Sequence, residues 1–137
     1  MSNSEHLLAV IEPNEAGEVS LDIATDHVTR GGTATLVVLL DEQTRDDLRR
    51  FADAEGLHLH TGQAIALDRL VDSYTARVGG ETNTIVAEST DSARELLEVA
   101  AASRATSMVI PQHVAARRSL RRLVSDTTVP LLIAPAA

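Results

Sequence analysis

Residues 107–134 read SMVIPQHVAARRSLRRLVSDTTVPLLIA, and this stretch decides the fold. A short apolar strand is predicted over Ser107–Ile110, and a loop follows at Pro111–Val114. An amphipathic helix is expected over Ala115–Ser125, and a second apolar strand over Pro130–Ala134. A strand–loop–helix–strand unit places its ligand site in the loop at the carboxyl end of the first strand.

The rest of the chain repeats this alternation of strands and helices. Three more strands, each with a buried apolar centre, are predicted at Leu7–Ile11, Thr33–Leu40 and Thr84–Ala87. Four helices are expected: over Glu15–Arg30, over Gln43–Ala54, behind a cap at Thr61 in the less regular stretch Leu57–Gly80, and behind Ser92. The alternation predicts an α/β fold, with an open parallel sheet and helices on both faces, in a single domain spanning residues 1–137.

The composition excludes several classes of function. A net charge of −8 argues against a basic nucleic-acid surface. Cysteine is absent, which excludes disulfides and a cysteine nucleophile. All 12 basic residues are arginine, so a Walker loop and a Schiff-base enzyme lack their lysine. Without a signal peptide or a membrane-length apolar run, we expect a cytoplasmic protein that binds neither nucleic acid nor membranes.

The stretch Ser107–Pro135 and the order of the elements resemble the universal stress protein family. The resemblance implies a Rossmann-like sheet, similar to that of the adenine nucleotide alpha hydrolases, with strand order 3-2-1-4-5. Members that bind ATP carry Gly-x2-Gly-x9-Gly-Ser/Thr after the fourth strand. Aligned on this sequence, the motif puts Pro111, Val114 and Val124 at the glycine positions, and only Ser125 matches.

These replacements predict that ATP binding of the family's usual kind is lost. Pro111 has no N–H to donate to a phosphate. Val114 and Val124 bring β-branched bulk to positions that need a close approach of the backbone. Glu12 occupies the place of the family's aspartate, which contacts the adenine end of the nucleotide. We therefore expect no cofactor, and ATP and AMP are disfavoured.

Several polar residues near this loop have two interpretations. Arg117, Arg118, Arg121 and Arg122 share one arc of the expected helix, which is either an anion site or a solvated face, and we favour the solvated face. His113 is either an anion donor or a surface histidine. Ser125 is either a surviving phosphate donor or a residue at the end of the helix, and we favour the second interpretation.

The leading functional expectation is a non-catalytic regulatory protein of the stress response with an unidentified protein partner. The alternative is a nucleotide or small-anion sensor that uses Glu12 and the Arg117–Arg122 face in a rebuilt pocket. An enzyme is not expected, because no nucleophile elbow or acid–base pair is present. His58 and His60 lack a third ligand, so no metal site is predicted.

The fifth predicted strand suggests a homodimer. In the order 3-2-1-4-5 it lies at a sheet edge, where unpaired backbone groups invite a second chain. The resemblance implies pairing through the same strand. The expected contact residues are Val129, Leu131, Leu132 and Ile133, and Leu132→Pro would weaken the contact if the Leu132 N–H faces the partner.

Overall fold

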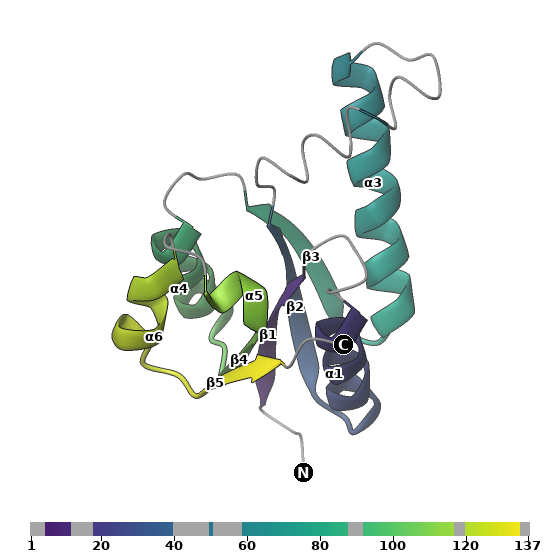
Figure 1. Ribbon diagram of the computed structural model, residues 1–137. Coiled ribbons are helices and arrows are strands. Elements are labelled where there is room, and N and C mark those ends of the chain that lie inside the picture. The colour runs from purple at the N-terminus through teal and green to yellow at the C-terminus, as the bar shows by residue number, and fades with distance from the viewer. Residues whose placement is uncertain are drawn as a thin grey trace.

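The computed structural model describes residues 5–11, 18–39, 50, 59–87, 92–116 and 120–134. Its centre is a five-stranded parallel sheet in the order β3-β2-β1-β4-β5 (Figure 1). The strands are β1 (His6–Ile11), β2 (Thr33–Leu39), β3 (Thr82–Ala87), β4 (Ser107–Pro111) and β5 (Leu131–Ala134). The helices are α1 (Glu18–Thr29), α3 (Leu59–Val78), α4 (Ser92–Ser103), α5 (Gln112–Ala115) and α6 (Arg121–Asp126). The predicted α/β fold and its strand order are confirmed.

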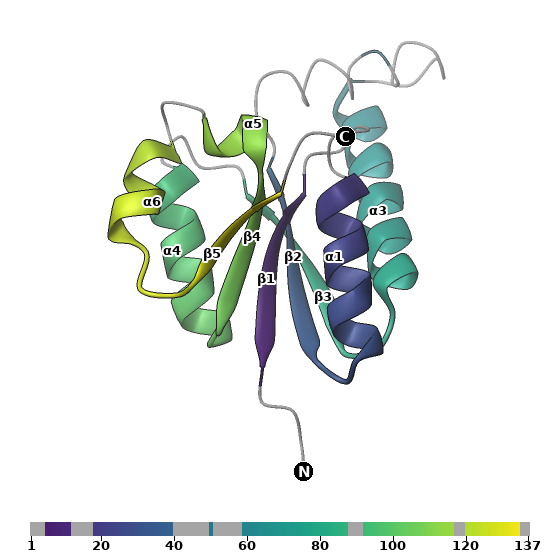
Figure 2. The ribbon, with the colours of Figure 1, turned by 60° about the horizontal axis from the view of Figure 1, so that its bottom comes forward.

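Two helical layers cover the sheet, one on each face (Figure 2). Helices α1 and α3 pack side by side on one face, and α4 and α6 pack together on the other. In Figure 2 the parallel strands run upward, so their carboxyl ends meet at the end of the sheet where α5 begins. That end is where a doubly wound protein binds its ligand.

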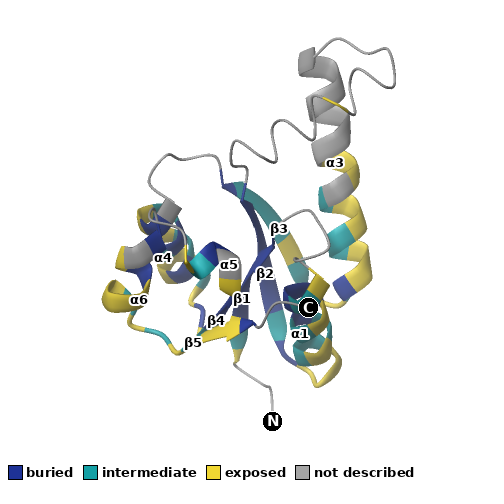
Figure 3. Cartoon of the chain, in the orientation of Figure 1, coloured by how far each residue is buried: buried dark blue, intermediate teal, exposed yellow. Residues whose placement is uncertain are grey.

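The central strand β1 is buried on both faces, as its apolar run predicted (Figure 3). Successive side chains of a strand alternate between the two faces of the sheet. Leu7, Ala9 and Ile11 therefore belong to the core on the α1 face. Leu8 and Val10 belong to the core on the α4 face. Both cores are aliphatic, as a sequence with 1% aromatic residues requires.

Helix α1 ends as the sequence predicted. Gly31 follows it with φ 98°, in the left-handed region that glycine enters without steric cost. An ion pair joins Arg30 to the last turn of the helix, with Arg30 Nη2 3.2 Å from Asp26 Oδ2. The two glycines at the end of α3, Gly79 and Gly80, also have positive φ.

Two expectations about helices are wrong. Helix α3 begins at Leu59, so Thr61 lies inside it and does not cap it. The single helix expected over Ala115–Ser125 is instead two, α5 and α6. Leu120, the residue before α6, has φ −112° and ψ 3°, outside the α-helical region, and its side chain is buried in the core on the α4 face. The expected helix at 43–54 falls almost entirely outside the described residues.

Candidate functional site

The predicted ligand loop begins at Pro111, the last residue of β4, which pairs with Ala134 of β5. Pro111 is buried and has φ −59° and ψ 142°, and α5 starts at the next residue. Proline carries no N–H, so this position offers an anion no backbone donor. The chain turns from strand to helix here without the glycine that a phosphate-binding loop would use.

Val114 is part of the hydrophobic core. Its side chain is 0% exposed and packs with residues of α4, β4 and α6. A phosphate loop needs this position to present backbone N–H groups to the ligand, with no side chain in the way. In this chain the side chain at this position packs in the core.

Ser125 lies in the last turn of α6 and hydrogen-bonds within it. Its hydroxyl donates to the Arg122 carbonyl oxygen at 3.1 Å, with Asp126 Oδ1 at 3.3 Å. Arg122 also pairs with Asp126, with Nε 3.6 Å from Oδ2. Val124 is 52% exposed, so it does not belong to the apolar face of this segment, which is formed by Leu120 and Leu123.

The remaining predicted site residues are only partly described. Glu12 and Arg117 lie outside the described residues. The backbones of His113 and Arg121 are placed in α5 and α6, but their side chains are not described. His58 lies outside the described residues, and the described part of the chain contains no group of three or more His, Asp or Glu side chains that could hold a metal.

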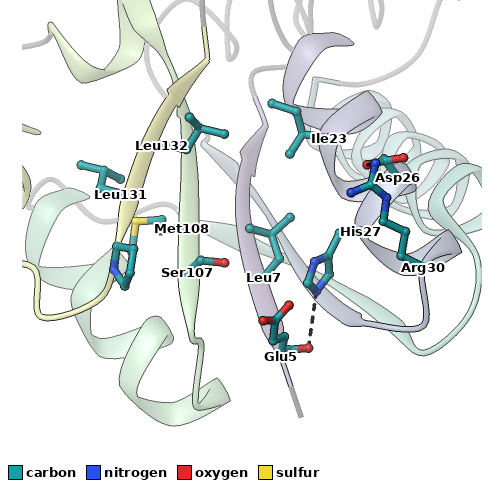
Figure 4. Close-up of a pocket in the computed structure, with 11 residues that line it drawn as sticks. Glu5, Leu7, Ile23, Asp26, His27, Arg30, Ser107, Met108, Leu131 and Leu132 are labelled. Carbon is teal, nitrogen blue, oxygen red and sulfur yellow. Dashed lines mark hydrogen bonds and ion pairs between the residues drawn. The ribbon is translucent and has the colours of Figure 1, made fainter. Parts of the chain in front are cut away.

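A groove that the sequence did not predict lies near the amino ends of β1 and β4, away from the loop that carries Pro111. It has a volume of about 390 Å³ and separates α1 from β5 (Figure 4). Leu7, Ile23 and Leu132 give it an apolar lining, and His27 and Glu5 lie at one end. Its other lining residues are Asp26, Arg30, Ser107, Met108, Pro130 and Leu131. They come from segments far apart in the chain, so no local sequence pattern marks the groove.

The clearest electrostatic perturbation near the groove is at His6, the first residue of β1. Burial, and then the nearby His27, lower the pKa of His6 below its ordinary value. Both ring nitrogens of His6 have partners, with Nδ1 2.7 Å from Thr33 Oγ1 and Nε2 2.7 Å from Thr35 Oγ1.

Within the described residues, no helix has the length and apolar character required to cross a membrane.

A parallel sheet in the order β3-β2-β1-β4-β5, with helices on both faces, defines a doubly wound α/β protein. The fold is that of the universal stress proteins, as the sequence resemblance implied. A universal stress protein in complex with cAMP has a TM-score of 0.65 at 7% identity, over 99% of this chain and 100% of that one.

Two further structures of this family resemble the chain. A universal stress protein family member from Burkholderia pseudomallei has a TM-score of 0.59 at 20% identity, over 96% of each chain. The universal stress protein of Archaeoglobus fulgidus in complex with dAMP has a TM-score of 0.60 at 15% identity, over 98% of this chain and 99% of that one. At such identities the likeness concerns the fold. No protein-family model and no curated protein matches the sequence.

Proposed function

We propose that this chain is a divergent universal stress protein with a regulatory, non-catalytic role, and that it does not bind ATP through the family's phosphate loop. The observation that carries the proposal is Val114, whose side chain is 0% exposed and belongs to the core. Pro111 adds a second obstacle, since it cannot donate a backbone hydrogen bond. The chain would act through a protein partner in the cytoplasm, and cell fractionation and affinity capture test those two points.

A second candidate function is supported by the ligands of the structural neighbours. Two of them were solved with cAMP and dAMP, each of which carries a single phosphate group. A monophosphate does not need a loop that cradles a triphosphate, so a rebuilt pocket at the carboxyl ends of β1 and β4 could accept one. Glu12 and Arg117 are the residues that we assign to the nucleoside and phosphate ends of such a pocket.

Calorimetric titration with ATP–Mg, AMP and cAMP distinguishes the two candidates. The first predicts no saturable heat for any of them up to about millimolar ligand. The second predicts saturable binding of a monophosphate and a rise in melting temperature, because a ligand of the native state stabilises it. Glu12→Ala and Arg117→Ala should then remove the binding, whereas Arg94→Ala, at an exposed position of α4, should not. Micromolar binding of ATP would contradict the first proposal.

The proposal includes a homodimer paired through β5. This strand is at the edge of the sheet, where Leu132 is 54% exposed and Ile133 is 43% exposed. Val129 and Leu131, which were also predicted at the interface, are partly buried against the core of their own subunit. Leu132 and Ile133 are therefore the side chains that a second copy would cover.

The backbone of β5 indicates which groups a partner would reach. The Met108 N–H donates to the Pro130 carbonyl oxygen at 2.9 Å, and Met108 is in register with Leu131. Successive residues of a strand direct their backbone groups to opposite edges, so Leu132 faces β4, whereas Leu131 and Ile133 face the free edge. Leu132→Pro would therefore disrupt the β4–β5 pairing inside one subunit, and Ile133→Pro is the better test of the dimer.

Two-fold symmetry then favours one register. An axis at Leu132 sets Leu131 opposite Ile133 of the partner subunit, so both outward-facing residues form hydrogen-bonded pairs. An axis at Ile133 would pair that residue with its own copy and would place Leu131 opposite Pro135 of the partner subunit, which has no N–H. The first register also brings the two exposed Leu132 side chains together on the α1 face.

A further inference from the structure

The sheet has a second open edge, at β3. This strand is the outermost one on the side of the sheet away from β5, so no strand of the described chain pairs with its far side (Figure 1). Of its six residues only Ala87 is buried, and the apolar side chains of Ile85 and Val86 remain partly exposed (Figure 3). Further apolar surface would therefore be buried if another strand were added to this edge.

The pairing of β3 with β2 shows which backbone groups face the open edge. The Ala34 N–H of β2 donates to the Glu81 carbonyl oxygen at 3.5 Å, so the backbone of Glu81 faces β2. Successive residues of a strand direct their backbone groups to opposite edges, so Thr82, Thr84 and Val86 direct theirs away from β2. Within the described structure, the outward N–H and C=O groups of these three residues have no hydrogen-bond partner.

The strand β3 lacks the features that usually protect an edge strand from other chains. Such strands are blunted by prolines, by charged side chains, by bulges or by being very short. The six residues of β3, TNTIVA, include no proline and no charge, and their register with β2 is unbroken. The β5 edge is more restricted, since that strand has four residues and lies between Pro130 and Pro135. The β3 edge is therefore the better one for a strand from a different protein.

Two carboxylates of α3 lie on the side of that helix that faces β3. Thr75 of α3 contacts the strand directly, with its Oγ1 2.6 Å from Thr84 Oγ1. At about 100° per residue, Asp68 and Asp72 lie within about 60° of Thr75 around the helix, so they share its side. Arg77 lies about 160° from Thr75, where it pairs with α1. We call Asp68 and Asp72 the acidic stripe.

The acidic stripe gives the open edge a negative charge that the described structure does not neutralise. Asp68 and Asp72 are exposed, and so is Glu81, the residue directly before β3. Among the described residues, no ion pair or side-chain hydrogen bond involves any of these three carboxylates. An added strand would lie about 4.8 Å from β3, so a lysine or arginine on its α3 face could reach the acidic stripe. The charge of this edge therefore favours a basic partner.

We propose that the free edge of β3 binds an extended basic segment of a partner protein as a sixth strand. The outward backbone groups of Thr82, Thr84 and Val86 supply the hydrogen bonds that give strand addition its affinity. Basic side chains of the segment meet the acidic stripe on the α3 face, and apolar ones meet Ile85 on the α4 face, so basic and apolar residues alternate. The inference rests on the proposed protein-binding role, because it names the kind of partner that this role requires.

A second copy of the chain suits this edge less well than a basic segment does. Two-fold pairing of β3 with itself would run antiparallel and would bring the acidic stripes and Glu81 of both copies to one interface. Like charges brought close together repel each other. A basic segment instead supplies the cations that the edge lacks.

Binding of a fluorescein-labelled peptide of four Lys-Val repeats, measured by fluorescence anisotropy, tests the β3 edge. We expect saturable binding, and amide hydrogen exchange at Thr84 and Val86 should slow by at least about tenfold when the peptide is bound. Exchange at Ile133, on the β5 edge, should not change. A peptide of four Glu-Val repeats should not bind. Absence of saturable Lys-Val binding up to about millimolar peptide would overturn the proposal.

Variants separate strand addition from general attraction of a basic peptide to an acidic protein. Thr84→Pro removes an outward N–H, at a position where an edge strand tolerates proline, and should weaken binding at least about tenfold. Thr84→Val keeps that N–H and should bind normally. Asp68→Asn with Asp72→Asn should weaken binding by up to about fivefold for each lost charge. Glu98→Gln with Asp126→Asn removes the same charge from the other helical layer and should weaken it less. Unchanged binding in Thr84→Pro would overturn the proposal.

Methylated peptides keep the test independent of whether a protein variant folds. Only alternate N–H groups of an added strand face β3, so N-methylation of either the lysines or the valines should abolish binding, and methylation of the other set should not. Full binding by both methylated peptides would overturn the proposal. So would a dimer that persists in Ile133→Pro and is lost in Thr84→Pro, because a second copy would then occupy β3. Micromolar ATP binding would instead contradict the proposed function and leave the peptide result unaffected.

Discussion

Arg77 of α3 lies against Glu18 in the first turn of α1, with Nη1 2.6 Å from Oε2. Its second terminal nitrogen, Nη2, is 3.1 Å from Oδ1 of Asp22, one turn further along α1. The hydrogen bond to Glu18 is the main reason why the pKa of Arg77 is raised above its ordinary value. One cation on α3 therefore links two carboxylates of α1, and the link lies next to Tyr74, which packs partly buried against the core of the α1 face.

Arg77→Met should lower the free energy of unfolding only slightly. The three side chains are substantially solvent-exposed, and exposed ion pairs contribute about 0–1 kcal/mol. Methionine keeps the apolar stem of the arginine, so the change isolates the charge. Urea unfolding measures the loss, which should shrink at high salt. Arg94→Met, which breaks an i,i+4 pair with Glu98, is the matched control. A loss well above that range would show that these ion pairs stabilise the protein more than exposed ion pairs ordinarily do.

Ser20→Ala should stabilise the protein. Ser20 is fully buried in α1, and its hydroxyl oxygen has no hydrogen-bond partner within the described structure. An unpaired buried hydroxyl costs about 1–3 kcal/mol, and alanine is also the better helix former. Ser73→Ala on the exposed side of α3 measures the helix-propensity part alone. Equal gains in the two variants would mean that the buried hydroxyl carries no penalty.

Stability should fall as the pH falls through the titration range of His6. Burial first, and His27 second, lower the folded-state pKa below 6.5, so the unfolded chain binds a proton more readily than the folded one. The contribution of neutral His6 is therefore complete above the unfolded-state value and is lost progressively below it. Urea midpoints from about pH 8 to about pH 5 should decline less steeply in His6→Gln, and His27→Gln should show an intermediate slope. A His6→Gln slope equal to that of the unmodified protein would contradict the expectation.

Val114→Gly should destabilise the chain without restoring ATP binding. The substitution removes a buried side chain from the core and adds glycine to a helix, which together should cost about 3 kcal/mol. Val124→Gly, at a 52% exposed position of α6, should cost only about 1 kcal/mol. Thermal unfolding and calorimetry with ATP–Mg check both parts. Recovered ATP binding in Val114→Gly would show that one side chain had blocked a phosphate site.

The sequence predicted the sheet well because each of its signals is local. The apolar side chains of Leu7–Ile11 point to both faces of the strand, so they are all buried only if helices cover both faces of the sheet. Gly31 ends α1 through its own positive φ and needs no distant residue to do so. The division into α5 and α6 was not predicted, because the burial of Leu120, just before α6, depends on a core that other elements build. At the candidate site, the lack of a backbone N–H donor at Pro111 could be predicted from the residue type alone.

The groove and the contacts of His6 and His27 could not be predicted, because they depend on the tertiary structure. His6 meets Thr33 and Thr35 only after β1 pairs with β2, and the threonines read as ordinary strand residues. His27 is one more polar residue on α1 until the fold brings it to Glu5. A period of about 2 residues in a strand or about 3.6 in a helix shows which face a side chain takes, but not which distant residue it will meet there.

The register of the proposed dimer can be tested with a single thiol, because the chain has no cysteine of its own. If the two-fold axis passes through Leu132, the two copies of that residue form a non-hydrogen-bonded antiparallel pair, with Cα atoms about 4.5 Å apart. That separation suits a disulfide, so Leu132→Cys should form a covalent dimer under mild oxidation. Ile133→Cys is the matched control on the same exposed edge. Its two copies would lie on opposite sides of the axis, separated by more than the ~7 Å limit for a disulfide, and should remain unlinked. Non-reducing gels and sedimentation report both variants. Preferential linking of Ile133→Cys would shift the axis by one residue, and a monomeric unmodified protein at tens of micromolar would end the dimer proposal.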